Sequence, residues 1–219
     1  MKYFKILMLS LLLLPFAGCE KTETFNNTAD RVGHSRVIFF PIVTLKGDRY
    51  MVVPVGGTFT DPGVTAKVGD ADVPSTTSGT VNTSAPGVYT LVYTALNSDG
   101  FAATAIRTVA VYSTDASAAA NDLSGNYLRA ATGITSTWIK MAPGVYQVIN
   151  PGGAAAGASL VAIVFNATGF TVDMPTQVTS DGLTSSTTSE VYTNGSPSSY
   201  SWIFLNPGYG TGVRTFVKQ

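Results

Sequence analysis

Short β-type runs separated by closely spaced turn signals constrain the fold of this chain more than any other feature. The turns repeat a few combinations: Asp61-Pro62-Gly63, Ala85-Pro86-Gly87, Asn97-Ser98-Asp99-Gly100, Ala142-Pro143-Gly144, Asn150-Pro151-Gly152-Gly153 and Asn206-Pro207-Gly208. Proline presets φ and glycine accepts a positive φ, so each combination predicts a tight reversal of the chain. Such reversals between short apolar runs predict an all-β protein built from sandwiches or barrels.

Residues 36–113 are predicted to form a β-sandwich. Its expected strands are 37–40, 50–55, 88–95 and 104–112. Pro41 demotes the first of these to a sheet edge or a bend, because proline cannot donate to a strand ladder. In the third, alternation places Tyr89, Leu91 and Tyr93 on one face. Tyr89 is either a corner tyrosine whose hydroxyl bonds the backbone or an ordinary core aromatic.

Residues 125–219 are predicted to form a second, antiparallel domain, after a small-residue linker at 114–124. Its expected strands are 126–130, 136–141, 145–150, 160–166, 170–174, 187–192, 200–205 and 213–217. Sequential strands with short turns predict a meander that closes into a sandwich or a small barrel. The pentapeptide Ala-Pro-Gly-Val-Tyr occurs at 85–89 and again at 142–146. We interpret it as the same tight turn leading into a strand at both places.

The N-terminal segment resembles a lipoprotein signal peptide. Lys2 and Lys5 precede an apolar run at 6–14, and Pro15-Phe16-Ala17-Gly18 leads to Cys19, the sole cysteine. The run is shorter than the roughly 20 residues that span a bilayer. The resemblance implies cleavage after residue 18 and acylation of Cys19, for instance with palmitate. It predicts a membrane partner reached through this lipid, and a polar, flexible tether at 19–35.

Charge and cysteine content exclude several classes of function. The chain has 13 basic and 13 acidic residues, and two of the basic ones lie in the signal peptide, so the mature chain has a net charge of −2. Charged residues make up 12% of the sequence, and no basic patch could neutralise a row of phosphates. We therefore expect no nucleic-acid partner. With Cys19 acylated, no thiol remains for a metal site or a nucleophile.

Three segments of the first domain resemble the bacterial surface-protein immunoglobulin-like family. They are the Thr60-Asp61-Pro62-Gly63-Val64 turn, the Gly79-Thr80-Val81 step, and the strand from Gly87-Val88-Tyr89 to Tyr93-Thr94-Ala95. The resemblance implies an immunoglobulin-like spacer with no catalytic residues. Glu20-Lys21-Thr22-Glu23 is similar to the acidic surface-export signal of lipoproteins from glycan-foraging Gram-negative bacteria; its alternative is a solvated linker.

The second half resembles the C-terminal β-domain of lipoproteins that are encoded with polysaccharide-uptake systems. Asp122-Leu123-Ser124-Gly125-Asn126-Tyr127 and Asn150-Pro151-Gly152-Gly153 carry this resemblance. It implies an outer-membrane location facing the cell exterior, a polysaccharide ligand, and outer-membrane uptake proteins as partners. It assigns no binding residue.

Catalysis and metal binding have little support in the sequence. The single histidine, His34, lies in the tether, so no histidine-based triad is expected. Glycoside hydrolysis needs two carboxylates across a cleft, and the second domain offers only Asp173, Asp181 and Glu190. Asp70-Ala71-Asp72 supplies two carboxylates that could meet calcium, without a third ligand at a fixed spacing. We expect no enzyme activity and no cofactor.

Aromatic side chains are the remaining recognition groups of the second domain. Most must form its core, and alternation puts Tyr200, Trp202 and Phe204 on one face. The candidates for stacking on a sugar are Trp138, Trp202 and Tyr209, the last in a glycine-rich turn that we expect to pack it loosely. The sequence thus predicts a non-catalytic surface lipoprotein that captures a glycan. The alternative is a structural or adhesive surface protein that binds another protein.

Overall fold

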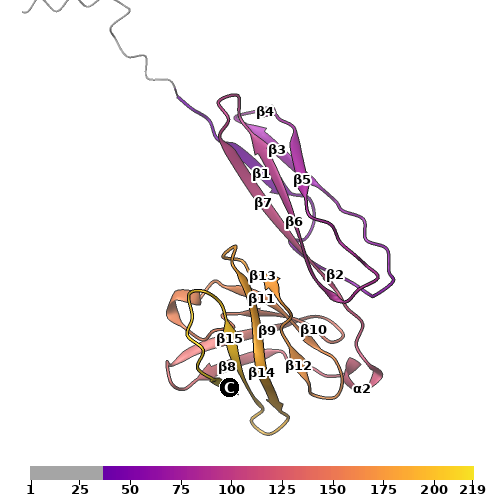
Figure 1. The fold of residues 1–219 in the computed structure, drawn as a ribbon, viewed down its shortest axis with the longest axis vertical. Coiled ribbons are helices and arrows are strands. Elements are labelled where there is room, and N and C mark those ends of the chain that lie inside the picture. The colour runs from indigo at the N-terminus through magenta and orange to yellow at the C-terminus, as the bar shows by residue number, and fades with distance from the viewer. Residues whose placement is uncertain (1–36) are drawn as a thin grey trace, which may run out of the picture. The chain divides into compact units, whose positions relative to one another are not determined.

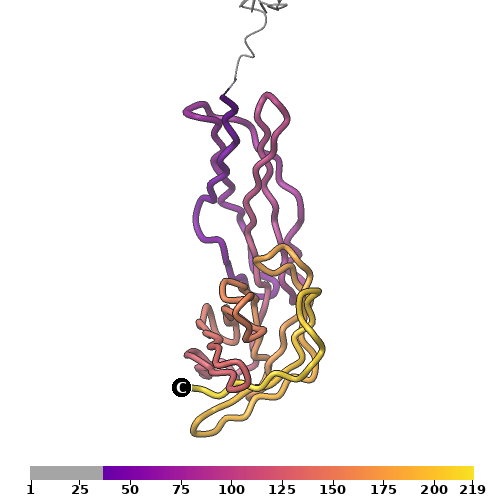
Figure 2. The backbone as a smooth tube through the Cα atoms, turned by 90° about the vertical axis from the view of Figure 1, so that its left-hand side faces the viewer, coloured from indigo at the N-terminus to yellow at the C-terminus, as the bar shows by residue number. Residues whose placement is uncertain are grey.

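The computed structural model describes residues 37–219, and seven strands form before residue 113 (Figure 1). They are β1 (Pro41–Leu45), β2 (Tyr50–Val53), β3 (Val64–Val68), β4 (Ala71–Asp72), β5 (Ser75–Ser78), β6 (Gly87–Leu96) and β7 (Ala102–Val111). One sheet has the order β1-β3-β4, and the other has the order β2-β7-β6-β5. The β1 strand packs against β6 and β7, so the two sheets face each other as a sandwich (Figure 2). We call residues 39–113 the N-terminal lobe.

The predicted signal peptide, the tether, Cys19 and His34 lie outside the described residues. The predicted strand at 37–40 is wrong, because β1 instead begins at Pro41. The first residue of a strand is one of the few positions where a missing N–H is tolerated. The other three predicted strands of this lobe correspond to β2, β6 and β7.

The turn before β3 has the predicted chemistry. Gly63 has a φ of 73°, and its N–H donates to Asp61 Oδ1 over 3.0 Å. Tyr89 is a corner tyrosine, since its hydroxyl donates to the Ala85 carbonyl oxygen at 3.0 Å. Alternation in β6 is also confirmed, with Leu91 and Tyr93 both buried.

The repeated pentapeptide does not form the same turn twice. Gly144 has a φ of 69° in the tight connection from β9 (Ile134–Ala142) to β10 (Val145–Ile149). Gly87 is instead the first residue of β6 and is not among the residues with positive φ. The flanking chain decides between the two conformations, because β9 pairs with β10 right next to Gly144, whereas β5 pairs with β6 only from Val92 onward.

Arg107 of β7 ties the sandwich together from its interior. Its side chain is fully buried and forms an ion pair with the Asp61 carboxylate. Its Nη1 also donates to Tyr93 Oη at 2.9 Å, and its Nε donates to the Asp48 carbonyl oxygen at 3.1 Å. The Tyr93 hydroxyl donates to Asp61 at 2.6 Å. Burial and this hydrogen bond raise the pKa of Tyr93 to about 12, so the phenol stays a neutral donor.

The segment after residue 113 begins with a short helix and then forms one large sheet. The helix is α2 (Ala116–Ala119), inside the predicted linker, and Asp115 caps it by accepting from the Ser117 N–H at 2.8 Å. The strands are β8 (Gly125–Arg129), β9, β10, β11 (Val161–Asn166), β12 (Val172–Asp173), β13 (Gln177–Val178), β14 (Thr184–Thr193), β15 (Ser199–Leu205) and β16 (Arg214–Lys218). A short 3-10 helix, η1 (Ala155–Gly157), lies between β10 and β11.

The nine strands are antiparallel throughout and have the order β12-β11-β10-β9-β8-β16-β15-β14-β13. The eight strands predicted here correspond to eight of these, although 170–174 shrinks to the two residues of β12. No pattern in the sequence predicts β13, which is equally short. We call residues 125–219 the C-terminal lobe. The predicted all-β class is confirmed.

The large sheet curls until its two ends are bonded to each other (Figure 2). At one point the Thr187 N–H of β14 donates to the Met174 carbonyl oxygen at 3.2 Å. At another, the Gln177 amide takes the place of a neighbouring strand beside β11. It accepts from the Ile163 N–H and donates to the Ile163 carbonyl oxygen, each over 2.7 Å. A side chain thus continues the ladder where β12 ends.

Residues 39–219 group into one compact unit by their contacts. Within it, the Tyr112 ring stacks on Phe165 of β11 with centroids 3.9 Å apart. The Asp115 N–H donates to the Ala167 carbonyl oxygen at 3.1 Å. The predicted domain boundaries, with a linker at 114–124 between 36–113 and 125–219, stay a prediction. Within residues 37–219, no helix combines the length and the apolar character needed to cross a bilayer.

Candidate ligand-binding hollow

The two tryptophans are core residues, so the prediction that they form an exposed stacking platform is wrong. Trp138 is 1% exposed and Trp202 is 0% exposed. Their rings stack with centroids 5.8 Å apart, and Tyr200 packs against both. The Trp202 indole N–H donates to the Pro151 carbonyl oxygen at 2.9 Å. The alternation of residues 200–204 therefore places Trp202 inside, as the pattern of that strand indicates.

Tyr209 alone among the three candidates lines a cavity, and its surroundings differ from those expected. Its ring meets Phe204 edge-on, with centroids 4.9 Å apart. A Cβ built on Gly157 would lie 1.9 Å from the Tyr209 hydroxyl, and one built on Gly152 would lie 2.3 Å from its ring. The ring therefore packs firmly against two glycines that leave room for it. The expectation of loose packing in a glycine-rich turn is wrong.

The cavity beside this ring, which we call the Tyr209 hollow, has a volume of about 720 Å³. Four segments converge on it: the turn between β1 and β2 that carries Arg49, the η1 region, the loop before β14, and the loop between β15 and β16. It is lined by Arg49, Ala154, Ala156, Gly157, Ser159, Leu160, Ser180, Asp181, Leu183, Asn206, Gly208, Tyr209, Gly210 and Arg214. An aromatic ring and aliphatic side chains thus stand beside hydroxyl, amide and charged groups.

Asp181 and Asn206 hold two walls of the hollow together. The Asn206 amide donates to Asp181 Oδ2 at 3.2 Å and to Ser185 Oγ at 2.9 Å. Asp181 Oδ1 accepts from the Thr179 hydroxyl at 2.6 Å and from the Leu183 N–H at 3.1 Å. Burial raises the pKa of Asp181, but these hydrogen bonds outweigh burial and hold it below its usual range. The carboxylate is therefore ionised at neutral pH.

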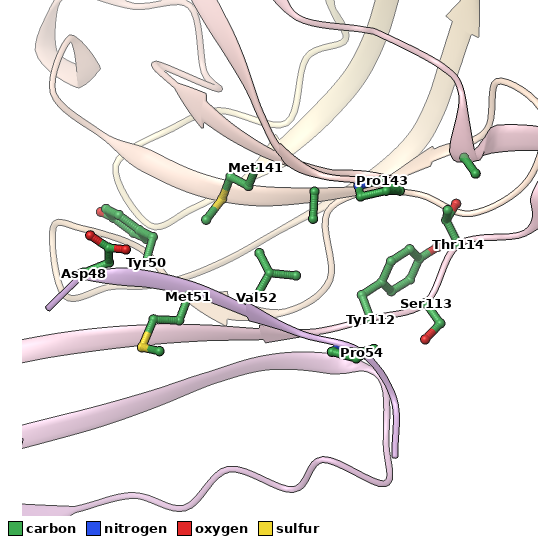
Figure 3. Close-up of a pocket in the computed structure, with 12 residues that line it drawn as sticks. Asp48, Tyr50, Met51, Val52, Pro54, Tyr112, Ser113, Thr114, Met141 and Pro143 are labelled. Atoms are coloured by element: carbon green, nitrogen blue, oxygen red, sulfur yellow. The ribbon is translucent and has the colours of Figure 1, made fainter. Parts of the chain in front are cut away.

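A second cavity, which we call the apolar cavity, has a volume of about 650 Å³ (Figure 3). Its labelled side chains include Val52 and Tyr112, opposite Met141 and Pro143. Two of its polar groups are engaged, since Ser113 Oγ accepts from the Val55 N–H at 3.1 Å and the Thr114 hydroxyl donates to the Asn166 carbonyl oxygen at 2.5 Å. The Asp48 carboxylate and the Tyr50 side chain also line it. The aliphatic side chains of Met51, Val52 and Met141 give this cavity an apolar part that could receive an apolar side chain.

The remaining carboxylates are not arranged as a catalytic pair across the Tyr209 hollow. Asp173 and Glu190 do not line it, and burial followed by the nearby Glu190 charge raises the pKa of Asp173. Asp72 lies 3.6 Å from Lys67 Nζ in an exposed ion pair. Among residues 37–219, no group of three or more His, Cys, Asp or Glu side chains could hold a metal ion. Calcium binding by Asp70 and Asp72 is therefore not supported by a third ligand of these types in the described part.

Comparisons with known proteins identify part of the chain. Residues 43–111 match the model of the family described as "Bacterial surface protein, Ig-like domain". The N-terminal lobe therefore contains an immunoglobulin-like domain of bacterial surface proteins, as the motifs indicated. A crystal structure of a lipoprotein from Bacteroides thetaiotaomicron is also similar, with 25% sequence identity and a TM-score of 0.43 over 82% of this chain and 100% of that chain. No protein of curated function matches the sequence.

Proposed function

We propose that this protein is a lipid-anchored outer-membrane protein that faces the cell exterior and captures a glycan without cleaving it. The observation that carries the proposal is the Tyr209 hollow, where an aromatic ring stands beside Asp181, Arg214 and serine hydroxyl groups. A sugar ring offers apolar C–H faces and a rim of hydroxyl groups, and this lining complements both. The surface-protein domain at 43–111 supports a location at the cell surface.

The anchor and the setting are supported by the sequence. The signal peptide resemblance and Cys19 support acylation, and the acidic stretch at 20–23 supports export to the surface. The resemblance of the second half supports uptake proteins of a polysaccharide system as neighbours. In this arrangement the immunoglobulin-like domain is a spacer that carries the C-terminal lobe away from the membrane.

A glycan array screened with the mature chain carrying Cys19→Ser tests the proposal. The residue to vary is Tyr209, and Tyr209→Leu removes the planar ring while it keeps an apolar side chain beside Phe204. We expect this variant to lose at least about 1 kcal/mol of binding free energy. Phe101→Leu, which alters an aromatic side chain that is 42% exposed in the N-terminal lobe, is the matched control. Absence of retention on every glycan would refute capture.

A structural or adhesive role is the second candidate, and the apolar cavity favours it (Figure 3). A protein partner would insert an apolar side chain between Val52 and Met141, two residues that line this cavity. Val52→Asp places a charge there and would abolish such an interaction while the Tyr209 hollow keeps its lining. Glycan binding that survives Val52→Asp would assign the two cavities to separate roles.

A further inference from the structure

Arg214, at the start of β16, has a guanidinium group that the protein leaves largely unpaired. The residue is 7% exposed, and its Nη2 donates to the Gly210 carbonyl oxygen at 3.2 Å. Its Nε and Nη1 are buried and have no acceptor among the described residues. No carboxylate of residues 37–219 lies within ion-pair distance of it. Buried arginines are ordinarily paired, because an unpaired charge inside a protein is costly.

The surroundings of Arg214 increase this cost. Burial and then the positive charge of Arg129 lower the pKa of Arg214. Arg129 donates from Nη1 to the Gly153 carbonyl oxygen at 3.2 Å, while its Nε is also buried without an acceptor. The Tyr209 ring offers partial compensation, with its centroid 5.2 Å from the Arg214 Cζ atom. A cation–π contact is worth less than a carboxylate partner at the same site.

The charges around the Tyr209 hollow therefore do not balance. Arg214 and the exposed Arg49 line it, and Arg129 stands behind Arg214, whereas Asp181 is the single carboxylate of the lining. Asp181 already accepts three hydrogen bonds from the loops that it joins. A hollow with low-dielectric walls and excess positive charge attracts anions.

We propose that the ligand of the Tyr209 hollow is an acidic glycan, whose carboxylate or sulfate group lies toward Arg214 and Arg49 while a sugar ring lies against Tyr209. This inference rests on the proposed function and names the class of glycan. Both anionic groups match the donor fork of a guanidinium group, which makes parallel hydrogen bonds to paired oxygens. The guanidinium group of Arg49 is exposed and can donate to the anionic group directly. Arg214 contributes a buried positive charge next to the Tyr209 ring.

Binding to three polysaccharides tests the inference and separates the two sources of negative charge. The mature Cys19→Ser chain is titrated by calorimetry with a polyuronate, with a sulfated dextran and with neutral dextran. We expect at least one acidic polymer to bind roughly tenfold or more tightly than the neutral one. Its binding should also weaken between about 50 and about 500 mM NaCl, because the Debye length is about threefold shorter at the higher salt concentration. Preference for the polyuronate assigns a carboxylate ligand, and preference for the sulfated polymer assigns a sulfate ligand.

Replacing the arginines of the Tyr209 hollow shows whether they bind the anionic group. Arg214→Gln should weaken acidic-polymer binding about tenfold or more without lowering the melting temperature, because it removes an unpaired buried charge. Should Arg214→Gln fail to fold, the exposed Arg49→Gln decides in its place. Lys67→Gln, which removes one exposed positive charge from the β3–β4 hairpin, is the matched control.

The outcomes distinguish this inference from the function on which it rests. Equal binding of neutral and acidic polymers overturns the acidic class and leaves glycan capture standing. A loss with Lys67→Gln as large as that with the hollow variants shows non-specific attraction and also overturns the inference. Binding of no polysaccharide at all, here and on the glycan array, overturns both proposals.

Discussion

Replacing Gln177 should open the C-terminal lobe where its sheet closes. The amide of this residue accepts from the Ile163 N–H and donates to the Ile163 carbonyl oxygen, both at 2.7 Å, and Gln177 is 4% exposed. Gln177→Ala leaves both backbone groups of Ile163 without partners. Each buried group left unpaired costs about 1–3 kcal/mol. We therefore expect the free energy of unfolding to fall by about 3 kcal/mol.

Urea titration followed by tryptophan fluorescence measures this loss directly. The chain has two tryptophans, Trp138 and Trp202, and both lie in the core of the C-terminal lobe, so the signal reports on that lobe. The matched control is Gln147→Ala. Gln147 lies in β10 and is the strand partner of Ile163 on the side of β11 opposite Gln177. No hydrogen bond of the Gln147 side chain occurs within residues 37–219, and its replacement should cost less than about 0.5 kcal/mol.

Gln177→Glu is a more specific test, because it keeps the shape of the side chain and replaces the NH2 group, which donates to Ile163, with a carboxylate oxygen. An ionised Glu at this position faces the Ile163 carbonyl oxygen with a second acceptor. Burial raises the pKa of such a carboxyl in the folded state, so the variant recovers stability relative to wild type as pH falls through that pKa. A Gln177→Ala loss no greater than the Gln147→Ala loss, or a Glu deficit that is the same at pH 7 and pH 4.5, would refute the closure by this amide.

Three further predictions concern other parts of the molecule. Cys19→Ser should release the protein from membranes, and incorporation of radiolabelled palmitate into that variant would contradict the assignment. Burial raises the pKa of Asp61, but the hydrogen bonds from Tyr93 and Gly63 and the Arg107 charge outweigh it and hold this pKa below its usual range. The stabilisation by Asp61 is therefore present above about pH 4 and lost as pH falls further. Asp61→Asn should flatten this acid part of a melting-temperature profile, and an unchanged acid slope would show that the ion pair contributes nothing. Gly144→Ala should lower the melting temperature markedly, since its Cβ would lie 2.5 Å from Thr114 atoms at a φ of 69°, whereas Gly169→Ala, with a φ of 47° and open space, should cost only the backbone strain of about 1 kcal/mol.

Local patterns predicted most of the secondary structure because alternation and turn chemistry act over a few residues. The strand from residue 87 to 96 and the Asp61–Gly63 turn follow from such patterns. The two-residue β13 does not, because its position depends on the Gln177 contact with Ile163, 14 residues away in sequence. Gly87 and Gly144 show the same limit, since identical pentapeptides adopt different backbone conformations according to their partners.

The candidate site was less predictable than the fold. Residue type suggested Trp138 and Trp202, but ring size favours the core as strongly as it favours a sugar, and both indoles are buried. The glycine-rich turn points to Tyr209 through its expected flexibility, whereas Gly152 and Gly157 are the residues that make room for its ring. Arg214 gave no signal in the sequence, because a lone arginine near the C-terminus acquires meaning only when the other loops of the hollow surround it.

The closure by Gln177 also bears on how copies of this protein coexist. A free strand edge presents unpaired N–H and C=O groups on which another chain can add, and this is a common start of aggregation. In the C-terminal lobe, the Gln177 amide occupies such groups of β11, and the backbone of β14 bonds Met174 beyond the end of β12. Where copies of this chain meet at high concentration, these bonds leave fewer unpaired groups of β11 and β14 on which another chain could add a strand.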